Sequence, residues 1–551
     1  MPVPKSVSSF LSRHFCTKPK LPSFSNIPSK YRPHSIKEAQ KALIDYLHTT
    51  RSLPYTFAEH IAKNSLFSLS NLTQNIHFSA PKFSRRFRKF LRYHPINEFE
   101  FLFESIGLNY DEIAAFLPPN KFFFYEDRSV LDAACALSGF GFPWNMLGKL
   151  YKEEASIFRK TSSELNSTLD EFKRYGFNSV SIICICLAFP HVLAGGIVAG
   201  LLEGLKSDFS EFCMVESEGD FGSCYEICKK FRLFYNLGLE KGKVGALMSK
   251  KKSIFLEFPE EILAQKADYF CRFDVKKQDV GLLLVHSPEI LNLDLNSPMI
   301  SVVGLLKHVG LGTDELNHVV DKFSHVLGRN QMTNLPNIMR ALDLHKWFFY
   351  EIMNDYELLA TYCLNSPDED VDEGFGLSLE TIRLSRTPTH TMNKLKFLHG
   401  IGYGENSVTI GVLSRLHGTD RELQERFDCL LRMGIEFSKL CSMIQIAPKI
   451  LNQKPDILEQ KVEFLCRQIG SSLEYLDVFP AFLCFDLEKR MKPRYRFHMW
   501  LRKKGLCSRD YSIASIMATS EKKFVARIFG IHPAAPKHWF ETFSYTTSAH
   551  N

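Results

Sequence analysis

The chain has 551 residues, of which 45% are hydrophobic and 23% are charged, and its formal net charge is +7. This globular composition excludes a wholly disordered chain, and the length allows several domains or one extended repeat array. The 14 cysteines contain no C-x2-C pair, which argues against a disulfide scaffold or a zinc ribbon and favours reduced thiols in a reducing compartment.

Residues 1–37 differ in composition from the rest of the chain. They contain seven Lys or Arg and eight Ser but no Asp or Glu. Such a segment is typical of an organelle transit peptide, since a secretory signal needs an uninterrupted apolar core. Arg13-His14-Phe15 precedes Cys16, which predicts cleavage near residue 15. We expect a mitochondrial location; import into the chloroplast and a simple disordered tail are the alternatives.

Residues 38–95 are expected to form an N-terminal helical extension that carries a basic run, "PKFSRRFRKFLRYHP". Phenylalanines alternate with the charges, so two interpretations stay open: an amphipathic cap for the first repeat, or a phosphate-binding surface. The six cations of the run are Lys82, Arg85, Arg86, Arg88, Lys89 and Arg92. We select Arg85, Arg86 and Arg88 as candidate nucleic-acid contacts.

A short phrase, a helix followed by an apolar-Gly-apolar triplet, recurs between residues 96 and 527. The repeats that follow one another directly lie 34 to 36 residues apart. A second phrase, a proline followed two residues later by an apolar pair, stands at Pro190, Pro288, Pro448 and Pro480. The first phrase occurs at Gly107, Gly141, Gly176, Gly238, Gly310, Gly400, Gly434, Gly470 and Gly505, with Asp274 in the equivalent slot between Gly238 and Gly310.

These two phrases predict a repeated pair of helices. Glycine after a helix supplies the left-handed cap that ends it, and proline stops the shorter helix of each pair. A single pair cannot bury its own apolar face, so neighbouring pairs must stack. We therefore predict an all-α fold, an α-solenoid of about 35-residue helical repeats over residues 96–527. Degenerate copies are expected in the two long gaps, from Gly176 to Gly238 and from Gly310 to Gly400. Residues 528–551 are expected to form a C-terminal tail.

Residues 180–202 contain no Lys, Arg, Asp or Glu and are long enough to cross a membrane. Pro190 interrupts this stretch, and Gly195 and Gly196 weaken its second half. The sequence therefore predicts two buried helices that meet at a proline turn and no membrane insertion. A membrane protein anchored through these residues is the alternative.

The segment 487–506 is the most basic part of the chain. Eight of its twenty residues are Lys or Arg, and Glu488 is its only acid. Residues 486–527 carry twelve basic and four acidic side chains, a local balance of +8 that accounts for the whole basic excess. A localised basic surface is the usual footprint of a polyanion partner. We select Arg490, Lys492, Arg494, Arg496, Lys503 and Lys504 as candidate phosphate contacts.

The helical spacing of this segment divides its side chains between two faces. Pro493 is expected to begin a helix, because its fixed φ suits a first turn. Arg496, Trp500 and Lys503 then share one face, whereas Phe497 and Leu501 share another and are expected in the core. Trp500 could either pack or stack on a base.

The chain lacks the sequence motifs of the common catalytic sites. It contains no P-loop, HExxH or GxSxG motif. Asp368–Gly374 imitates the start of a calcium loop, but Glu373 and Leu379 occupy the positions that require Gly and a bidentate Glu. We therefore predict a protein without enzymatic activity, cofactor or metal.

The glycine and proline frame, and above all "FPAFLCFDLEKRMKPRYRFHMWLRKKGL", resembles the mitochondrial transcription termination factor (mTERF) family over residues 96–527. The leader and "YRPHSIKEAQKALIDYLHTTRSLP" are similar to its plant branch. The resemblance implies a half-doughnut superhelix that binds nucleic acid in an organelle and acts in transcription initiation or termination, intron splicing or ribosome assembly. Missing prolines and the interval 311–399 depart from the family pattern.

Our first hypothesis is a monomeric, non-catalytic protein that binds double-stranded DNA or organellar RNA, or both, and works with other organellar gene-expression proteins. The second is a protein-interaction scaffold that does not bind nucleic acid, because solenoids offer long surfaces to peptides too. The concentration of basic residues at one end favours the first hypothesis. The sequence leaves the choice between DNA and RNA, and the step of gene expression, open.

Overall fold

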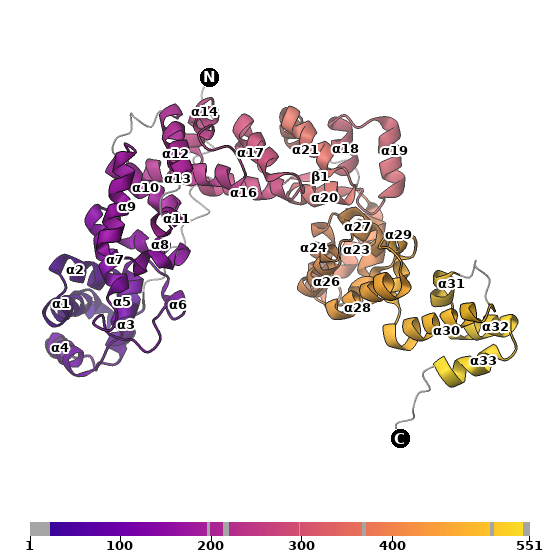
Figure 1. Cartoon of the computed structure of the whole chain (residues 1–551), viewed down its shortest axis with the longest axis horizontal. Helices are drawn as coiled ribbons and strands as arrows, with labels where there is room; N and C mark the ends of the chain where they lie inside the picture. Colours follow the sequence, from indigo (N-terminus) through magenta and orange to yellow (C-terminus); the bar gives the residue numbers. More distant parts are fainter. Residues whose placement is uncertain are drawn as a thin grey trace. The chain divides into compact units, whose positions relative to one another are not determined.

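A computed structural model describes residues 22–195, 199–212, 220–296, 298–365, 371–506 and 512–543. Helices make up nearly all the regular structure of these residues (Figure 1), which confirms the predicted all-α class. The chain divides at Glu260 into two compact units, residues 1–260 and 261–551, and each is described by itself. The predicted cleavage site near residue 15 lies outside the described part of the chain.

The first unit consists of helices joined by short turns. Its 3-10 helices are η1 Ser29–Tyr31, η2 Ala80–Lys82, η3 Trp144–Met146 and η4 Ala155–Arg159. Its α-helices are α1 Arg32–Arg51, α2 Tyr55–Asn64, α3 Leu66–Gln74, α4 Phe83–Tyr93, α5 Glu98–Ser105, α6 Tyr110–Ile113, α7 Ser129–Phe140, α8 Leu147–Glu153, α9 Ser162–Arg174, α10 Ser179–Ala188, α11 His191–Ala194, α12 Ala199–Glu211, α13 Phe221–Asn236, α14 Val244–Ser249 and α15 Lys252–Glu257.

The second unit, which starts at the second residue of α16, also consists of helices joined by short turns. Its α-helices are α16 Glu260–Cys271, α17 Lys277–His286, α18 Val302–His308, α19 Thr313–Lys322, α20 Leu335–Ala341, α21 His345–Asn354, α22 Glu357–Leu364, α23 Glu373–Arg383, α24 Pro388–Gly400, α25 Ser407–Leu413, α26 Asp420–Arg432, α27 Phe437–Ile446, α28 Pro455–Glu463, α29 Tyr475–Val478, α30 Lys492–Lys503, α31 Ile513–Ala518, α32 Glu521–Ile531 and α33 Ala535–His538. Its 3-10 helices are η6 Pro288–Asn292, η7 Met332–Asn334, η8 Pro448–Asn452 and η10 Pro480–Cys484, and its π-helical turns are η9 Phe464–Ile469, η11 Leu487–Met491 and η12 Trp539–Phe543.

The folded part of the first unit starts before residue 38. Phe24 and Ile27 are buried, and the Phe24 backbone N–H donates to Ser70 Oγ at 3.3 Å. Arg32, the first residue of α1, donates from Nε to the Ile27 carbonyl oxygen at 2.8 Å. The segment that precedes α1 therefore packs against α3, although its composition belongs to the predicted leader.

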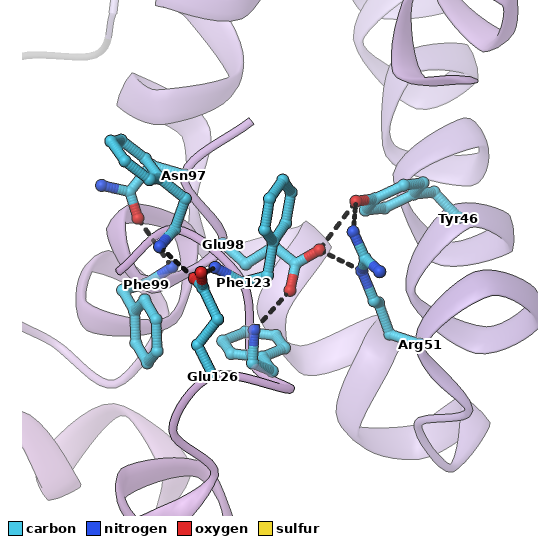
Figure 2. A network of polar contacts seen from close by, with 9 residues as sticks. Tyr46, Arg51, Asn97, Glu98, Phe99, Phe123 and Glu126 are labelled. Atoms are coloured by element: carbon cyan, nitrogen blue, oxygen red, sulfur yellow. Dashed lines mark hydrogen bonds and ion pairs between the residues drawn. The ribbon is translucent and has the colours of Figure 1, made fainter. Parts of the chain in front are cut away.

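A buried carboxylate joins the N-terminal extension to the first repeat (Figure 2). Glu98, at the start of α5, is 1% exposed. Its carboxylate accepts a hydrogen bond from Tyr46 Oη at 2.7 Å, pairs with Arg51, and accepts from the Phe124 backbone N–H at 2.8 Å. The Arg51 guanidinium also lies over the ring of Phe123, 4.8 Å from its centroid. Every partner of this buried charge thus comes from the protein itself, which makes the network structural.

The left-handed residues that end the longer helices lie where the sequence predicts them. Gly107, Gly141, Gly176, Gly238, Asp274, Gly310, Gly434, Gly470 and Gly505 all have positive φ. At Gly238 and Gly310 the next residue closes the cap: Leu239 N–H donates to the Phe234 carbonyl at 3.1 Å, and Leu311 N–H donates to the Leu306 carbonyl at 2.9 Å.

Two caps differ from the prediction in the interval 311–399 and at its end. Gly400 is the last residue of α24, and the left-handed residue is Gly402. The prediction for Gly400 was therefore wrong by two residues, because helix α24 continues through the first glycine of "GIGYG". Asp343 also has positive φ (58°), and it marks a repeat that contains no glycine phrase. Leu344 N–H donates to the Met339 carbonyl at 2.9 Å, which is the same cap.

The proline phrases end the shorter helices as predicted. Phe189, Ser287, Ala447 and Phe479, each directly before a proline, have φ between −126° and −135° and ψ between 60° and 68°. This common geometry lies outside the helical region, as expected before proline. Pro288, Pro448 and Pro480 then each begin a five-residue 3-10 helix.

A basic side chain ties each of several repeats to the turn of the next one. It stands eight residues before the left-handed residue on four long helices, and nine before Gly470, where the π-helical turn η9 inserts one residue. We call these five side chains the inter-repeat cations. Their hydrogen bonds run from Lys230 to the Phe255 carbonyl, Lys266 to Leu293, Lys394 to Leu416 (3.1 Å), Arg426 to Leu451 (2.9 Å) and Lys461 to Leu483 (2.9 Å).

A small antiparallel sheet was not predicted. Strand β1, Met299–Ser301, pairs with strand β2, Arg329–Gln331, and Ile300 lies opposite Asn330. Three residues per strand are too few to produce a recognisable alternation of apolar and polar residues.

The apolar stretch 180–202 forms α10 and α11 on either side of Pro190, followed by the start of α12. Ile182 to Phe189 are all buried, which confirms the first of the two predicted buried helices. After the proline, α11 has only four residues, of which Val192 and Leu193 are buried and His191 is exposed. None of the helices within the described ranges is both long and apolar enough to cross a membrane.

The array continues beyond residue 527. Helix α32 runs to Ile531, and α33 and η12 extend the folded chain to residue 543. Ile528, Ala535 and Trp539 are buried in one cluster with Phe497 and Leu501 of α30. Residues 528–543 therefore cover the last repeat, whereas the sequence suggested a tail from residue 528.

We expect Glu98→Ala to lower the free energy of unfolding by about 3 kcal/mol, because it leaves Arg51 without its buried partner. Glu112→Ala is the matched control: it removes an exposed ion pair with Lys152 and should cost less than about 1 kcal/mol. Urea unfolding followed by circular dichroism measures both. Equal shifts of the midpoint in the two variants would contradict the structural role of the network.

The inter-repeat cation Lys266 predicts a pH dependence. Burial lowers its pKa from 10.5 to about 8, although Asp294 opposes the shift. The unfolded chain thus holds this proton between pH 8 and 10.5 while the folded chain releases it, so stability rises with pH in that window. Relative to Lys266→Met, the wild type should gain on the order of 3 kcal/mol from pH 8 to 10.5.

The measurement for Lys266 is urea unfolding of both proteins at several pH values. The difference between the free energies of unfolding of the two proteins at each pH cancels the contributions of all other titrating groups. Lys307→Met, which changes an exposed lysine on α18, is the control and should give a constant difference. A constant difference for Lys266→Met as well would refute the assigned burial cost.

Candidate nucleic-acid interface

The basic segment 487–506 forms the turn η11 and the helix α30. Asp486 caps the turn, because its side chain accepts from the Lys489 backbone N–H at 2.6 Å. Pro493 lies in the first turn of α30, as predicted. Phe497 and Leu501 are at most 1% exposed, which confirms that this face of the helix belongs to the core.

Two of the predicted phosphate contacts have structural roles instead. Arg494 is 2% exposed. Its guanidinium donates to the carbonyl oxygens of Ile516 at 2.8 Å and Thr519 at 2.7 Å, and to the Glu521 carboxylate at 2.6 Å. Arg490 donates to the same Thr519 oxygen at 2.6 Å. We therefore remove both arginines from the candidate interface: the guanidinium of Arg494 is buried among its acceptors, and that of Arg490 is half-buried, bonded to Thr519 and packed 4.3 Å from the centroid of the Phe485 ring.

The remaining predicted residues of this segment reach the surface. Lys492 is partly exposed and pairs with Glu488. Arg496, Lys503 and Lys504 are exposed and form no ion pair with any described residue. Lys489 and Arg502 belong to the same basic excess but were not among the predicted contacts; both are exposed as well. Their exposure was predictable from the sequence, because neither residue falls on the apolar face of the helix.

Trp500 packs within the protein. Its ring lies 5.5 Å from that of Phe497 and 4.3 Å from that of His538 in α33, measured between centroids. It borders the cluster that closes the last repeat. A base would have to displace these contacts, so the packing interpretation holds for Trp500.

In the first unit, the second basic run forms helix α4. Arg85 is exposed and has no ion pair with any residue that the structure describes. Arg86 donates to the His77 carbonyl at 3.0 Å, and Arg88 pairs with Asp45 of α1 at 3.2 Å while about half exposed. Exposed pairs of this kind contribute little and can exchange for a phosphate. All three predicted residues thus remain accessible.

No group of three or more His, Cys, Asp or Glu side chains that could hold a metal occurs in the described ranges. The chemistry that the two basic surfaces support is the binding of anions, because Arg and Lys donate hydrogen bonds and attract phosphate oxygens.

Comparison with known proteins gives a family match and several relatives. A family model described as mTERF matches residues 223–339 and 384–525. The interval between the two matched ranges contains the last residues of α20 and the helices α21, α22 and α23. The chain is 54% identical over 525 residues, 94% of both chains, to an Arabidopsis thaliana protein named transcription termination factor MTEF18, mitochondrial.

A more distant relative from the same plant is named transcription termination factor MTERF8, chloroplastic. It is 28% identical over 152 residues, which is 27% of this chain and 29% of the relative. A third, transcription termination factor MTERF15, mitochondrial, is 27% identical over 103 residues, 19% of this chain and 23% of the relative. No solved structure matches.

The different positions of Arg494 and Arg496 predict different effects on stability. Arg494→Ala should destabilise the protein by about 3 kcal/mol, because it removes a buried guanidinium that donates to the carbonyls of Ile516 and Thr519 and pairs with Glu521. Arg496→Ala should change stability by less than about 0.5 kcal/mol, since that side chain is exposed. Thermal unfolding of both variants tests this. A harmless Arg494→Ala would return this residue to the surface and to the candidate interface.

Proposed function

The chain belongs to the mTERF family, and from this premise we propose that it is a non-catalytic nucleic-acid-binding protein that regulates gene expression in mitochondria. It acts through transcription, at initiation or termination, or through RNA processing such as intron splicing. It binds as a monomer to double-stranded DNA or organellar RNA and works beside other gene-expression proteins of the organelle.

The mitochondrial location has two supports. The relative that covers 94% of the chain carries both "mitochondrial" and "transcription termination factor" in its name. Residues 1–37 contain basic residues and serines but no acid, as import leaders do. The chloroplast remains the alternative location, since one of the more distant relatives has a chloroplastic name.

One observation carries the nucleic-acid proposal. Arg496, Lys503 and Lys504 of the last long helix are exposed and unpaired with any described acid, although their neighbours Arg490 and Arg494 are used internally. Exposed cations without acids repel one another, and that cost is relieved when a polyanion binds and releases its counterions. These contacts reach phosphate groups, which determine affinity, and they carry no sequence information directly.

The alternative function, a protein-interaction scaffold, is favoured by a different observation. Leu364, Leu377 and Leu384 are 74% to 82% exposed on and around α22 and α23. Most of this segment lies in the interval that the family model does not match. Apolar side chains exposed in this way mark surfaces that bind proteins.

We expect the triple variant Arg496→Ala, Lys503→Ala, Lys504→Ala to bind a 20-base-pair duplex DNA at least tenfold more weakly at low salt. The slope of log affinity against log salt should fall by about 3, because three phosphate contacts are lost. Fluorescence anisotropy of the full chain at several salt concentrations measures both quantities.

The control variant removes three exposed cations elsewhere in the second unit, Lys277, Lys307 and Arg421, each changed to Ala. It has the same net charge as the test variant and should keep the wild-type salt slope. Unchanged binding by the test variant would refute this interface. Absence of binding by the wild type to duplex DNA and to RNA at about 100 mM salt would favour the scaffold.

A further inference from the structure

Helix α4 presents the most strongly basic surface of the first unit. Lys82, directly before the helix, and the five cations of the helix are all exposed, and no acidic residue occurs between residues 82 and 93. Arg85, Lys89 and Arg92 follow one another at helical spacing, so they form a row that extends about 10 Å along the helix axis. This row lies outside the residues that match the family model.

The apolar face of α4 is already used by the fold. Phe83, Phe87 and Leu91 are at most 4% exposed, and α4 packs against α1. A basic amphipathic helix that binds a membrane must insert its apolar face among the lipids. Because this face is buried, α4 can offer only its charged face to a partner, and a membrane surface does not fit.

Acidic side chains from the neighbouring helix do not neutralise the row. Asp45 of α1 pairs with Arg88. Glu38 of α1 accepts from Ser84 at 3.0 Å and pairs with Lys41. Neither acid forms an ion pair or hydrogen bond with Arg85, Lys89 or Arg92, so the row keeps its positive charge and fits a polyanion.

An exposed tyrosine stands at each end of the basic helix. Tyr93, the last residue of α4, is 73% exposed. Tyr31 is 41% exposed; its ring lies 5.8 Å from that of Phe78, which lies 5.7 Å from that of Phe83 at the start of α4. An exposed ring can stack on an unpaired base, whereas the bases of a duplex are stacked on one another.

From this arrangement we infer that α4 and its two flanking tyrosines form a separate binding site for single-stranded nucleic acid. The cation row follows the sugar-phosphate backbone, and Tyr31 and Tyr93 stack on bases. The inference rests on the proposed function, in that it assumes a nucleic-acid partner. It adds a second site with its own preference for strand state, in a different unit from the α30 surface.

The test is a titration of the full chain and its variants with three fluorescent probes: a 20-nucleotide uridine RNA, a 20-nucleotide thymidine DNA and a 20-base-pair duplex DNA. The triple variant Arg85→Ala, Lys89→Ala, Arg92→Ala should bind the single strands about tenfold more weakly. Its salt slope on them should fall by about 2, as expected for three contacts to a single strand. Binding of the duplex should change less than twofold.

Tyr93→Ala separates stacking from charge. It should weaken binding of the single strands about fivefold or more without changing the salt slope, whereas Tyr93→Phe should keep wild-type affinity because the ring remains. The titration with thymidine DNA shows whether the site binds both single-stranded DNA and RNA or only RNA. Both outcomes agree with the inference.

The matched control changes three exposed lysines of the same unit, Lys152, Lys173 and Lys243, to Ala, which alters the net charge equally. Equal losses for duplex and single strands in the α4 variant, or equal losses in the control, would overturn the inference. Circular dichroism verifies that each variant is folded.

Assaying the α30 variant alongside separates the two proposals. If the α4 variant loses single-strand binding while the α30 variant keeps duplex binding, the interface of the proposed function fails and the α4 site stands. If instead the α30 variant loses duplex binding while the α4 variant keeps single-strand binding, the α4 site is refuted and the interface of the proposed function stands.

Discussion

The hydrogen bond from an inter-repeat cation to the next turn is the contact on which the repeat array depends. Each helical pair buries only part of its apolar surface, so the pairs must be held in register with one another. The turn that follows each short helix ends in carbonyl groups that have no donor within the turn itself. Lys461, only 1% exposed, supplies a donor to Leu483 of the next repeat. Burial lowers its pKa, and the carbonyl offsets part of that cost.

This constraint divides the basic residues into two groups with different roles. Lysines and arginines on the inner side of a long helix are used for assembly, as Arg494 is at the last junction. Those on the outer side, such as Arg496, remain available for a partner. The number of basic residues in the sequence therefore overestimates the binding surface of α30. On α4 the two agree, because all the cations of that helix are exposed.

Local signals predicted the repeat array well. A left-handed cap and a proline turn depend on a few adjacent residues, so nearly every predicted cap was confirmed. This includes the cap at Asp274, where aspartate replaces the glycine of the other repeats. The cap at Asp343 was missed because aspartate is common at many other positions. The role of Arg494 could not be predicted, since its acceptors lie 22 to 27 residues further on. Within a basic segment, a buried arginine and a solvated one have the same sequence signature.

The helices after residue 527 have a consequence for the end of the array. Any stack of identical units exposes an unsatisfied apolar face at its terminus. Here the rings of Trp539 and Phe543, each 5.3 Å from that of Phe497, cover that face. A chain truncated after residue 527 would expose this apolar face, through which one chain would associate with another head to tail. The last sixteen described residues, 528–543, thus form the cap that a stack of repeats needs at its end.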